Sequence, residues 1–177
     1  MLTNSVIYLF SLLPISLIIG NSILNLNIFL IDLILLIYCW KNNYWIWVRS
    51  NIFKILIIIY IYLVINSIYN YSLNLNYGFD GILRSLSFIK FILLAFSLKI
   101  ILTQKDEVNK IMLNWMLILL IILIDVFYEF FIGHNILGFK SLDQTRIISF
   151  FYDENVVGGL ILTIGFVVIT FFLNKDL

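Results

Sequence analysis

Six long apolar segments follow one another along the chain, and they constrain its fold more than any other feature. They cover residues 6–19, 24–40, 52–68, 86–103, 111–132 and 156–173. Only 12% of the residues are charged, whereas a soluble domain carries about 25%. Apolar runs of about 20 residues are long enough to cross a bilayer as helices. The sequence therefore predicts an all-α, polytopic membrane protein with about six transmembrane helices, in a single transmembrane domain over residues 1–177.

The composition argues against several classes of function. The net charge is +1, so no strongly basic face indicates nucleic acid as a partner. Cys39 is the single cysteine and His134 the single histidine, which argues against a disulfide and against a multi-histidine metal or haem site. We therefore expect no cofactor and no metal. We expect Cys39, at the end of an apolar segment, to be a small buried side chain.

The basic residues predict how the segments are oriented, because short cytoplasmic loops are enriched in Lys and Arg. If the segments alternate, one side holds Lys41, Arg49, Lys54, Lys99, Lys105, Lys110 and Lys175. The other side holds Arg84, Lys90, Lys140 and Arg146. This asymmetry predicts that both termini are cytoplasmic and that the polar stretch 125–160 lies outside. The aromatic residues expected in an interfacial belt are Tyr44, Trp45 and Trp47.

Ionisable residues inside apolar segments usually face a partner or a water-filled cavity. Asp125 and Glu129 lie four residues apart, so they share one face of the fifth segment. They line a polar space beneath an external cavity, or they form hydrogen bonds that fix helix packing; both interpretations stay open. Lys90 either extends toward the interface or pairs with Asp125 or Glu129. Asp32 in the second segment has a similar ambiguity.

The external stretch also carries charges among aromatic rings. Lys140, Arg146, Asp153 and Glu154 stand between phenylalanine and tyrosine residues. A guanidinium suits phosphate or pyrophosphate because its planar fork donates two parallel hydrogen bonds, and the rings suit sugar faces or a lipid chain. The alternative is a solvated loop whose basic residues meet lipid headgroups. Asp153 or Asn155 is expected to cap the last helix, with Glu154 in its first turn.

These residues resemble a known family. The run DVFYEFFIGHNILGF, then Arg146, then ISFFYDENVVGGL is similar to the O-antigen ligase and O-antigen polymerase family of bacterial inner membranes. The family's Gly-x-(Asn or Asp)-x-x-Gly turn corresponds to Gly133, Asn135 and Gly138. Its arginine corresponds to Arg146 and its following phenylalanine to Phe151. The opening LLPISLIIGNSILNLNIFLIDLILLIY and the segment SLSFIKFILLAFSLKIIL also resemble the family, over its N-terminal half only.

The resemblance implies a metal-independent, GT-C-like glycosyltransferase of the inner membrane. It would move a glycan from undecaprenyl pyrophosphate to a lipid or glycan acceptor, among membrane lipids. Arg146 would be the catalytic residue, with Arg84, Lys140 and Glu154 binding substrate. The family's histidine lies in its second half, so His134 does not correspond to it. A second chain supplying the missing half would be a partner, and the chain is expected to be truncated and inactive alone.

A second class of function stays open. A non-enzymatic small membrane subunit or a transporter component would have the same size and hydropathy. Most ionisable residues lie near the ends of the segments, with Asp32 the main exception. That distribution argues against a proton-translocating subunit, whose ionisable residues are expected near the middle of the membrane.

Overall fold

The structure is a computed structural model of the chain, and it describes residues 2–73, 79–101, 105–140, 147–151 and 156–174. The described residues contain helices and no strand. The chain packs as two compact units, one formed by residues 3–27 and 104–177 and the other by residues 28–103. The all-α membrane fold is confirmed. A single domain over the whole chain stays a prediction.

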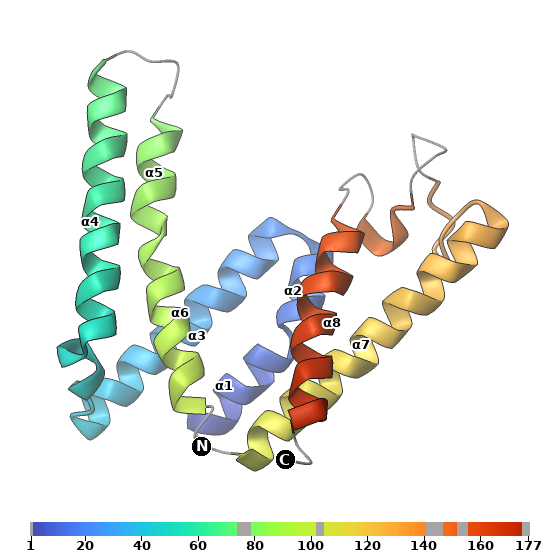
Figure 1. Cartoon of the computed structure of the whole chain (residues 1–177), viewed down its shortest axis with the longest axis horizontal. Coiled ribbons are helices and arrows are strands. Elements are labelled where there is room, and N and C mark those ends of the chain that lie inside the picture. Colours follow the sequence, from blue (N-terminus) through green and yellow to red (C-terminus); the bar gives the residue numbers. More distant parts are fainter. Residues whose placement is uncertain (1, 74–78, 102–104, 141–146, 152–155, 175–177) are drawn as a thin grey trace. The chain divides into compact units, whose positions relative to one another are not determined.

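Helices cover the six predicted apolar segments (Figure 1), but four described helices are long and apolar enough to cross a membrane, so six spans stays a prediction. In chain order the helices are α1 Leu2–Ser11, α2 Leu13–Ile19, α3 Asn21–Asn42, η1 Ile46–Arg49, α4 Asn51–Ser72, α5 Asp80–Ser87, α6 Ile89–Ile101, α7 Lys105–Ile132, η2 Ser149–Phe151 and α8 Val157–Leu173. Those long and apolar enough to cross a membrane are Asn21–Asn42, Asn51–Ser72, Asp80–Ile100 and Glu107–Ile132. Val157–Leu173 is apolar but shorter. The first predicted segment is two short helices.

The first segment is broken because of Pro14. The ring of proline has no N–H and disrupts the preceding turn of a helix. Accordingly α1 ends at Ser11, and α2 begins again with Pro14 in its first turn, where the missing N–H is tolerated. Gly20, with φ 134°, then joins α2 directly to α3, a conformation that favours glycine.

Polar side chains bind the backbone exposed by this break. Asn27 Nδ2 donates to the carbonyl of Leu9 at 3.1 Å and to Ser16 Oγ at 2.7 Å. The indole N–H of Trp115 on α7 donates to the carbonyl of Phe10 at 2.9 Å. Irregular backbone at membrane depth persists only where its polar groups have partners. In the same unit, α7 packs against α2, η2 and α8.

The second unit is built around a small apolar core. Its buried residues are Leu35, Cys39, Trp47, Ile92 and Phe96. The indole N–H of Trp47 donates to Cys39 Sγ at 3.2 Å, and its ring lies 4.9 Å from that of Phe96. Cys39 is buried, as expected. Trp47 is also buried, so it does not belong to the expected interfacial belt, whereas Tyr44 and Trp45 are exposed.

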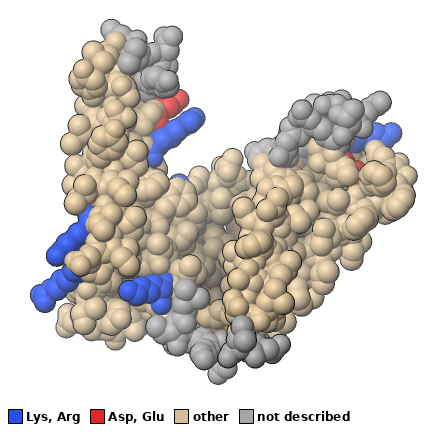
Figure 2. All heavy atoms as spheres, viewed as in Figure 1, with Lys and Arg blue, Asp and Glu red and all other residues tan. Residues whose placement is uncertain are grey.

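The hairpin of α4 and α5 completes this unit. The two helices pack side by side (Figure 1), and α4 begins at Asn51 because Ser50 Oγ accepts the backbone N–H of Phe53 at 3.2 Å. No residue of α4 is buried. Its visible surface is largely uncharged, and basic side chains gather near the connection from α3 to α4 (Figure 2). A helix of this length that is unburied and has its one charge, Lys54, in its first turn suits contact with lipid.

Candidate functional site

The last turns of α7 carry two buried carboxylates in an otherwise apolar helix. Asp125 and Glu129 lie one turn apart and are 0% and 5% exposed. A buried charge is costly unless hydrogen bonds compensate for the lost water. The chain after α7 supplies those hydrogen bonds, because it folds back over these two residues.

Asp125 holds two separate points of that returning chain. Its Oδ1 accepts the backbone N–H of Ile136 at 2.7 Å. Its Oδ2 accepts the hydroxyl of Ser149 at 2.6 Å. One carboxylate therefore joins the turn directly after α7 to the segment that precedes α8.

Glu129 binds only the segment that precedes α8, and it does so through the backbone of that segment. Both of its oxygens accept the N–H of Ile148, at 3.1 and 3.2 Å, and Oε2 also accepts the N–H of Ser149 at 2.6 Å. Ser149 has φ 49°, which is uncommon for a residue other than glycine. The hydrogen bonds that Ser149 donates to Asp125 and Glu129 hold it in this conformation, in which its N–H and hydroxyl both reach α7.

The turn after α7 has the glycine positions of the Gly-x-Asn-x-x-Gly pattern. Gly133 and Gly138 have φ 83° and 85°, and Gly133 N–H donates to the carbonyl of Glu129 at 2.8 Å. Asn135 is fully buried between them: its Oδ1 accepts the N–H of Phe139 at 2.8 Å, and its Nδ2 donates to the carbonyl of Ser149 at 2.5 Å. The asparagine therefore ties the turn to the same residue that the carboxylates hold.

We call Asp125, Glu129, Asn135 and Ser149 the carboxylate clamp. All four side-chain oxygens of its acids accept hydrogen bonds from the returning chain. Of the two roles expected for Asp125 and Glu129, this geometry gives them the packing role, acting between a helix and a loop. Lining an external cavity stays a prediction. Ile136, Ile148 and Ser149 were not expected to bind the acids; the signal that was present is a pair of acids in an apolar segment followed by a Gly-Asn-Gly turn.

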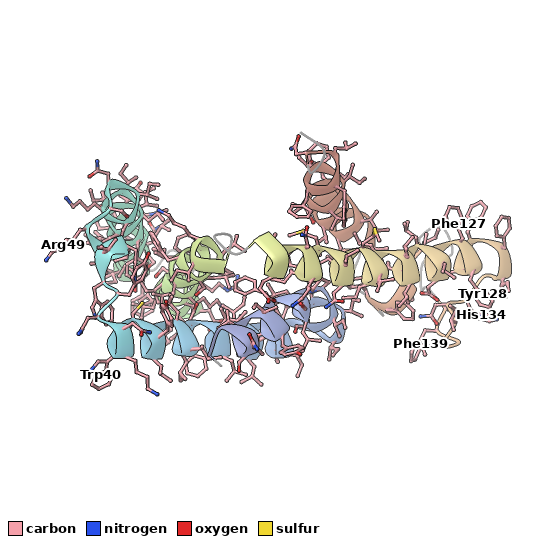
Figure 3. The ribbon with its side chains drawn as sticks, turned by 90° about the horizontal axis from the view of Figure 1, so that it is seen from below. Trp40, Arg49, Phe127, Tyr128, His134 and Phe139 are labelled. Carbon is pink, nitrogen blue, oxygen red and sulfur yellow. The ribbon has the colours of Figure 1, made fainter. Side chains whose placement is uncertain are left out.

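Aromatic side chains surround the end of α7 outside the clamp. Figure 3 shows Phe127, Tyr128, His134 and Phe139 gathered there. The rings of Tyr128 and His134 lie edge to face at 5.8 Å, and His134 Nδ1 lies 3.0 Å from the carbonyl of Asn135. Phe127 is 62% exposed. Exposed rings of this kind suit the membrane interface, a sugar face or a lipid chain.

The remaining predicted residues of this unit are only partly described. Lys140 follows the turn and is exposed. Arg146, Asp153 and Glu154 lie outside the described residues, so their predicted roles stay predictions. The N-cap position of α8 is occupied by Val156 without a side-chain hydrogen bond, so the prediction of Asp153 or Asn155 at that position was wrong.

Arg84 and Lys90 belong to the other unit. Arg84 lines a pocket between α4 and α5. Lys90 Nζ lies 5.0 Å from the centre of the Phe91 ring. The buried carboxylate of this unit is Asp32, which is 5% exposed and whose Oδ1 has no hydrogen-bond partner among the described residues. The sequence proposed Asp125 or Glu129 for Lys90, and that pairing is still a prediction.

Within the described residues, no cluster of three or more His, Cys, Asp and Glu side chains could hold a metal ion. No protein-family model matches the chain, and no curated protein and no solved structure matches it either. The functional argument therefore depends on the residues of the chain itself.

Proposed function

We propose that the chain acts in glycan transfer of the O-antigen ligase or polymerase type, in the inner membrane of a bacterium, with undecaprenyl pyrophosphate as the lipid carrier. The observation that supports this most is that the Glu129 carboxylate accepts hydrogen bonds from the N–H groups of Ile148 and Ser149. These residues come directly after Ile147 and Arg146 in the sequence. A clamped backbone next to an arginine is a suitable way to present a guanidinium to a fixed target.

In this proposal Arg146 binds the pyrophosphate of the carrier. Its two parallel N–H groups neutralise the charge that develops on the leaving pyrophosphate as the glycosidic bond breaks. Lys140 and Glu154 belong to the same loop and contact the substrate there. Asp125 and Glu129 are positioning residues, since their oxygens are already occupied by the backbone.

The proposal leaves part of the site to other residues. The resemblance covers the N-terminal half of the family. The residues that bind the acceptor, and the base that activates it, are therefore assigned to a further segment or to a second chain. The proposed orientation puts residues 125–160 outside the cytoplasm and both termini inside.

The test uses binding of the carrier and transfer of the glycan as separate measurements. The full chain is purified in detergent, and retention of undecaprenyl pyrophosphate is measured by native mass spectrometry. Arg146→Lys is expected to lose about tenfold in retention, because lysine cannot donate the paired hydrogen bonds. Arg49→Lys is the matched control, as Arg49 is exposed in the loop expected on the cytoplasmic side.

The transfer measurement follows surface-polysaccharide ladders in the host that carries the gene. Arg146→Lys should accumulate to the normal level and lose most of the ladder. Unchanged carrier retention together with normal ladders would refute the proposal, and would favour the alternative of a non-enzymatic subunit or transporter component.

A further inference from the structure

A pocket lined by both polar and apolar side chains lies between α4 and α5. Its volume is about 360 Å³. The residues that line it are Leu63, Asn66, Ser67 and Asn70 of α4, Gly81, Arg84 and Ser85 of α5, and Phe88 directly after α5. On each helix these residues fall at positions i, i+3, i+4 and i+7, which is one face. The faces of the two helices that meet in the hairpin therefore bring several polar side chains together.

The hydroxyls of the pocket are used to join the two helices. Ser67 Oγ and Ser85 Oγ lie 2.7 Å apart, within hydrogen-bond distance. Ser67 Oγ also contacts the carbonyl of Val64, and Ser85 Oγ contacts the carbonyl of Ile82, each within its own helix. These two serines are therefore not free to bind a ligand. They hold the walls of the pocket together.

The other polar groups of the pocket are available. The side chains of Asn66, Asn70 and Arg84 make no hydrogen bond or ion pair with another residue in the described part of the chain. Asp80 lies one turn before Arg84 but does not line the pocket. The lining thus offers one guanidinium and two amides, with no acid among them, which suits a phosphate group with neighbouring hydroxyls.

The position of the pocket indicates where such a ligand comes from. Asn70 and Gly81 lie in the last turn of α4 and the first turn of α5, near the end of two membrane-length helices. Leu63 and Phe88 lie further along both helices, away from that end. The pocket therefore changes from polar to apolar along the helices, as a phospholipid does from headgroup to acyl chain.

We propose that the α4–α5 pocket binds the headgroup of an anionic phospholipid of the bilayer. The phosphate sits on Arg84, the headgroup hydroxyls hydrogen-bond Asn66 and Asn70, and the first part of an acyl chain follows Leu63 and Phe88. The unburied surface of α4 leaves the pocket accessible from the lipid. This site does not depend on glycan transfer, and it gives Arg84 a ligand other than the carrier pyrophosphate.

The test is native mass spectrometry of the purified full chain with phosphatidylglycerol, and phosphatidylcholine as the reference lipid. The wild-type chain should retain phosphatidylglycerol preferentially. Arg84→Gln should reduce its retention about tenfold, since a charge-assisted hydrogen bond is lost. Arg49→Gln removes an exposed basic residue of the same unit and should leave retention unchanged.

A second variant tests the pocket without changing its charge. A Cβ at Gly81 meets no atom within 4 Å, so Gly81→Leu can fill the pocket while the helix is kept, which circular dichroism verifies. It should also reduce retention of phosphatidylglycerol. Normal retention in both Arg84→Gln and Gly81→Leu would overturn the proposal.

Competition distinguishes the sources of the phosphate group. Excess inorganic phosphate should not displace phosphatidylglycerol, because the acyl chain contributes to binding. Displacement by inorganic phosphate would show a simple anion site and overturn the lipid assignment. Displacement by an equimolar amount of undecaprenyl phosphate would assign the pocket to the carrier and would equally overturn it. The polysaccharide ladders of Arg146→Lys remain an independent test of the proposed glycan transfer.

Discussion

The indole of Trp115 on α7 donates its N–H, at 2.9 Å, to the carbonyl of Phe10 at the end of α1. That carbonyl would normally accept the N–H of the residue four positions later, and that residue is Pro14, which has none. Trp115 therefore supplies the donor that proline removes. The pair joins two helices of one unit whose residues lie 105 positions apart in the chain.

The first prediction concerns Trp115→Phe. Phenylalanine keeps most of the packing but has no N–H, so the Phe10 carbonyl loses its partner in an apolar setting. We expect a loss of about 1 kcal/mol in the free energy of unfolding, measured by denaturation in detergent micelles. Trp40→Phe is the matched control, because Trp40 is 79% exposed. Equal losses in the two variants would contradict the role of the hydrogen bond.

The second prediction concerns Glu129→Gln. Glutamine has one acceptor oxygen in place of two and no charge, whereas Glu129 accepts three short contacts from the N–H groups of Ile148 and Ser149. We expect a loss of about 2 kcal/mol and faster hydrogen exchange in the peptide that contains residues 147–151. Glu107→Gln breaks only the partly exposed contact with Lys110 and should leave that exchange unchanged. Slow exchange in Glu129→Gln would show that the clamp does not depend on the charge.

Hydropathy was sufficient to predict the helical class of the fold, because each long apolar run must satisfy its own backbone in lipid. The same signal did not predict how the first segment is broken. Pro14 was visible in the sequence, but the break is stable only because Trp115 and Asn27 bind the freed backbone. Such partners are distant in the chain, and a single sequence carries no signal that pairs them.

Only the two acids and the turn of the carboxylate clamp were predicted, and their connections to the loop were not. Asp125 and Glu129 stood out as acids in an apolar helix, and Gly133 and Gly138 as turn positions. The common partner of the two acids is Ser149, whose positive φ brings its N–H and hydroxyl to α7. This contact depends on the path of the loop, which hydropathy and spacing leave open. Trp47 was misplaced for a similar reason, because the acceptor of its N–H is the buried Cys39.

The third prediction separates the effect of the positive φ of Ser149 from the effect of its hydroxyl. Ser149→Gly permits the φ of 49° without strain but loses the hydroxyl that Asp125 accepts. Ser149→Ala loses the same hydroxyl and keeps a Cβ, so it should unfold more easily than the glycine variant by about 1 kcal/mol. Chemical denaturation of the two variants measures the difference. A glycine variant less stable than the alanine variant would show that Ser149 does not hold a positive φ in the folded protein.

The fourth prediction concerns the charges of the other unit. Asp32 and Lys90 lie at similar levels of α3 and α6, since Leu35 and Cys39 share a core with Ile92 and Phe96 one and two turns further along. If the two charges attract, Asp32→Asn and Lys90→Gln should each destabilise, and the double variant should be more stable than the sum predicts by about 1 kcal/mol.

The competing pairing is tested in the same series. Lys90→Gln combined with Asp125→Asn, or with Glu129→Gln, should give additive losses if Asp32 is the partner of Lys90. A coupling of Lys90 to Asp125 or Glu129, with none to Asp32, would restore the pairing that the sequence suggested and remove the one inferred within the unit.

The last prediction tests the orientation of the chain by labelling introduced cysteines in intact cells. Cys39 is fully buried, so the wild-type chain should not react with an impermeant thiol reagent. Lys140→Cys and Lys41→Cys replace two exposed lysines that the basic-residue asymmetry places on opposite sides. We expect Lys140→Cys to react from outside and Lys41→Cys to react only after the membrane is opened. The reverse pattern would invert the topology and put the carboxylate clamp on the cytoplasmic side, where the proposed transfer from a lipid carrier would have to be abandoned.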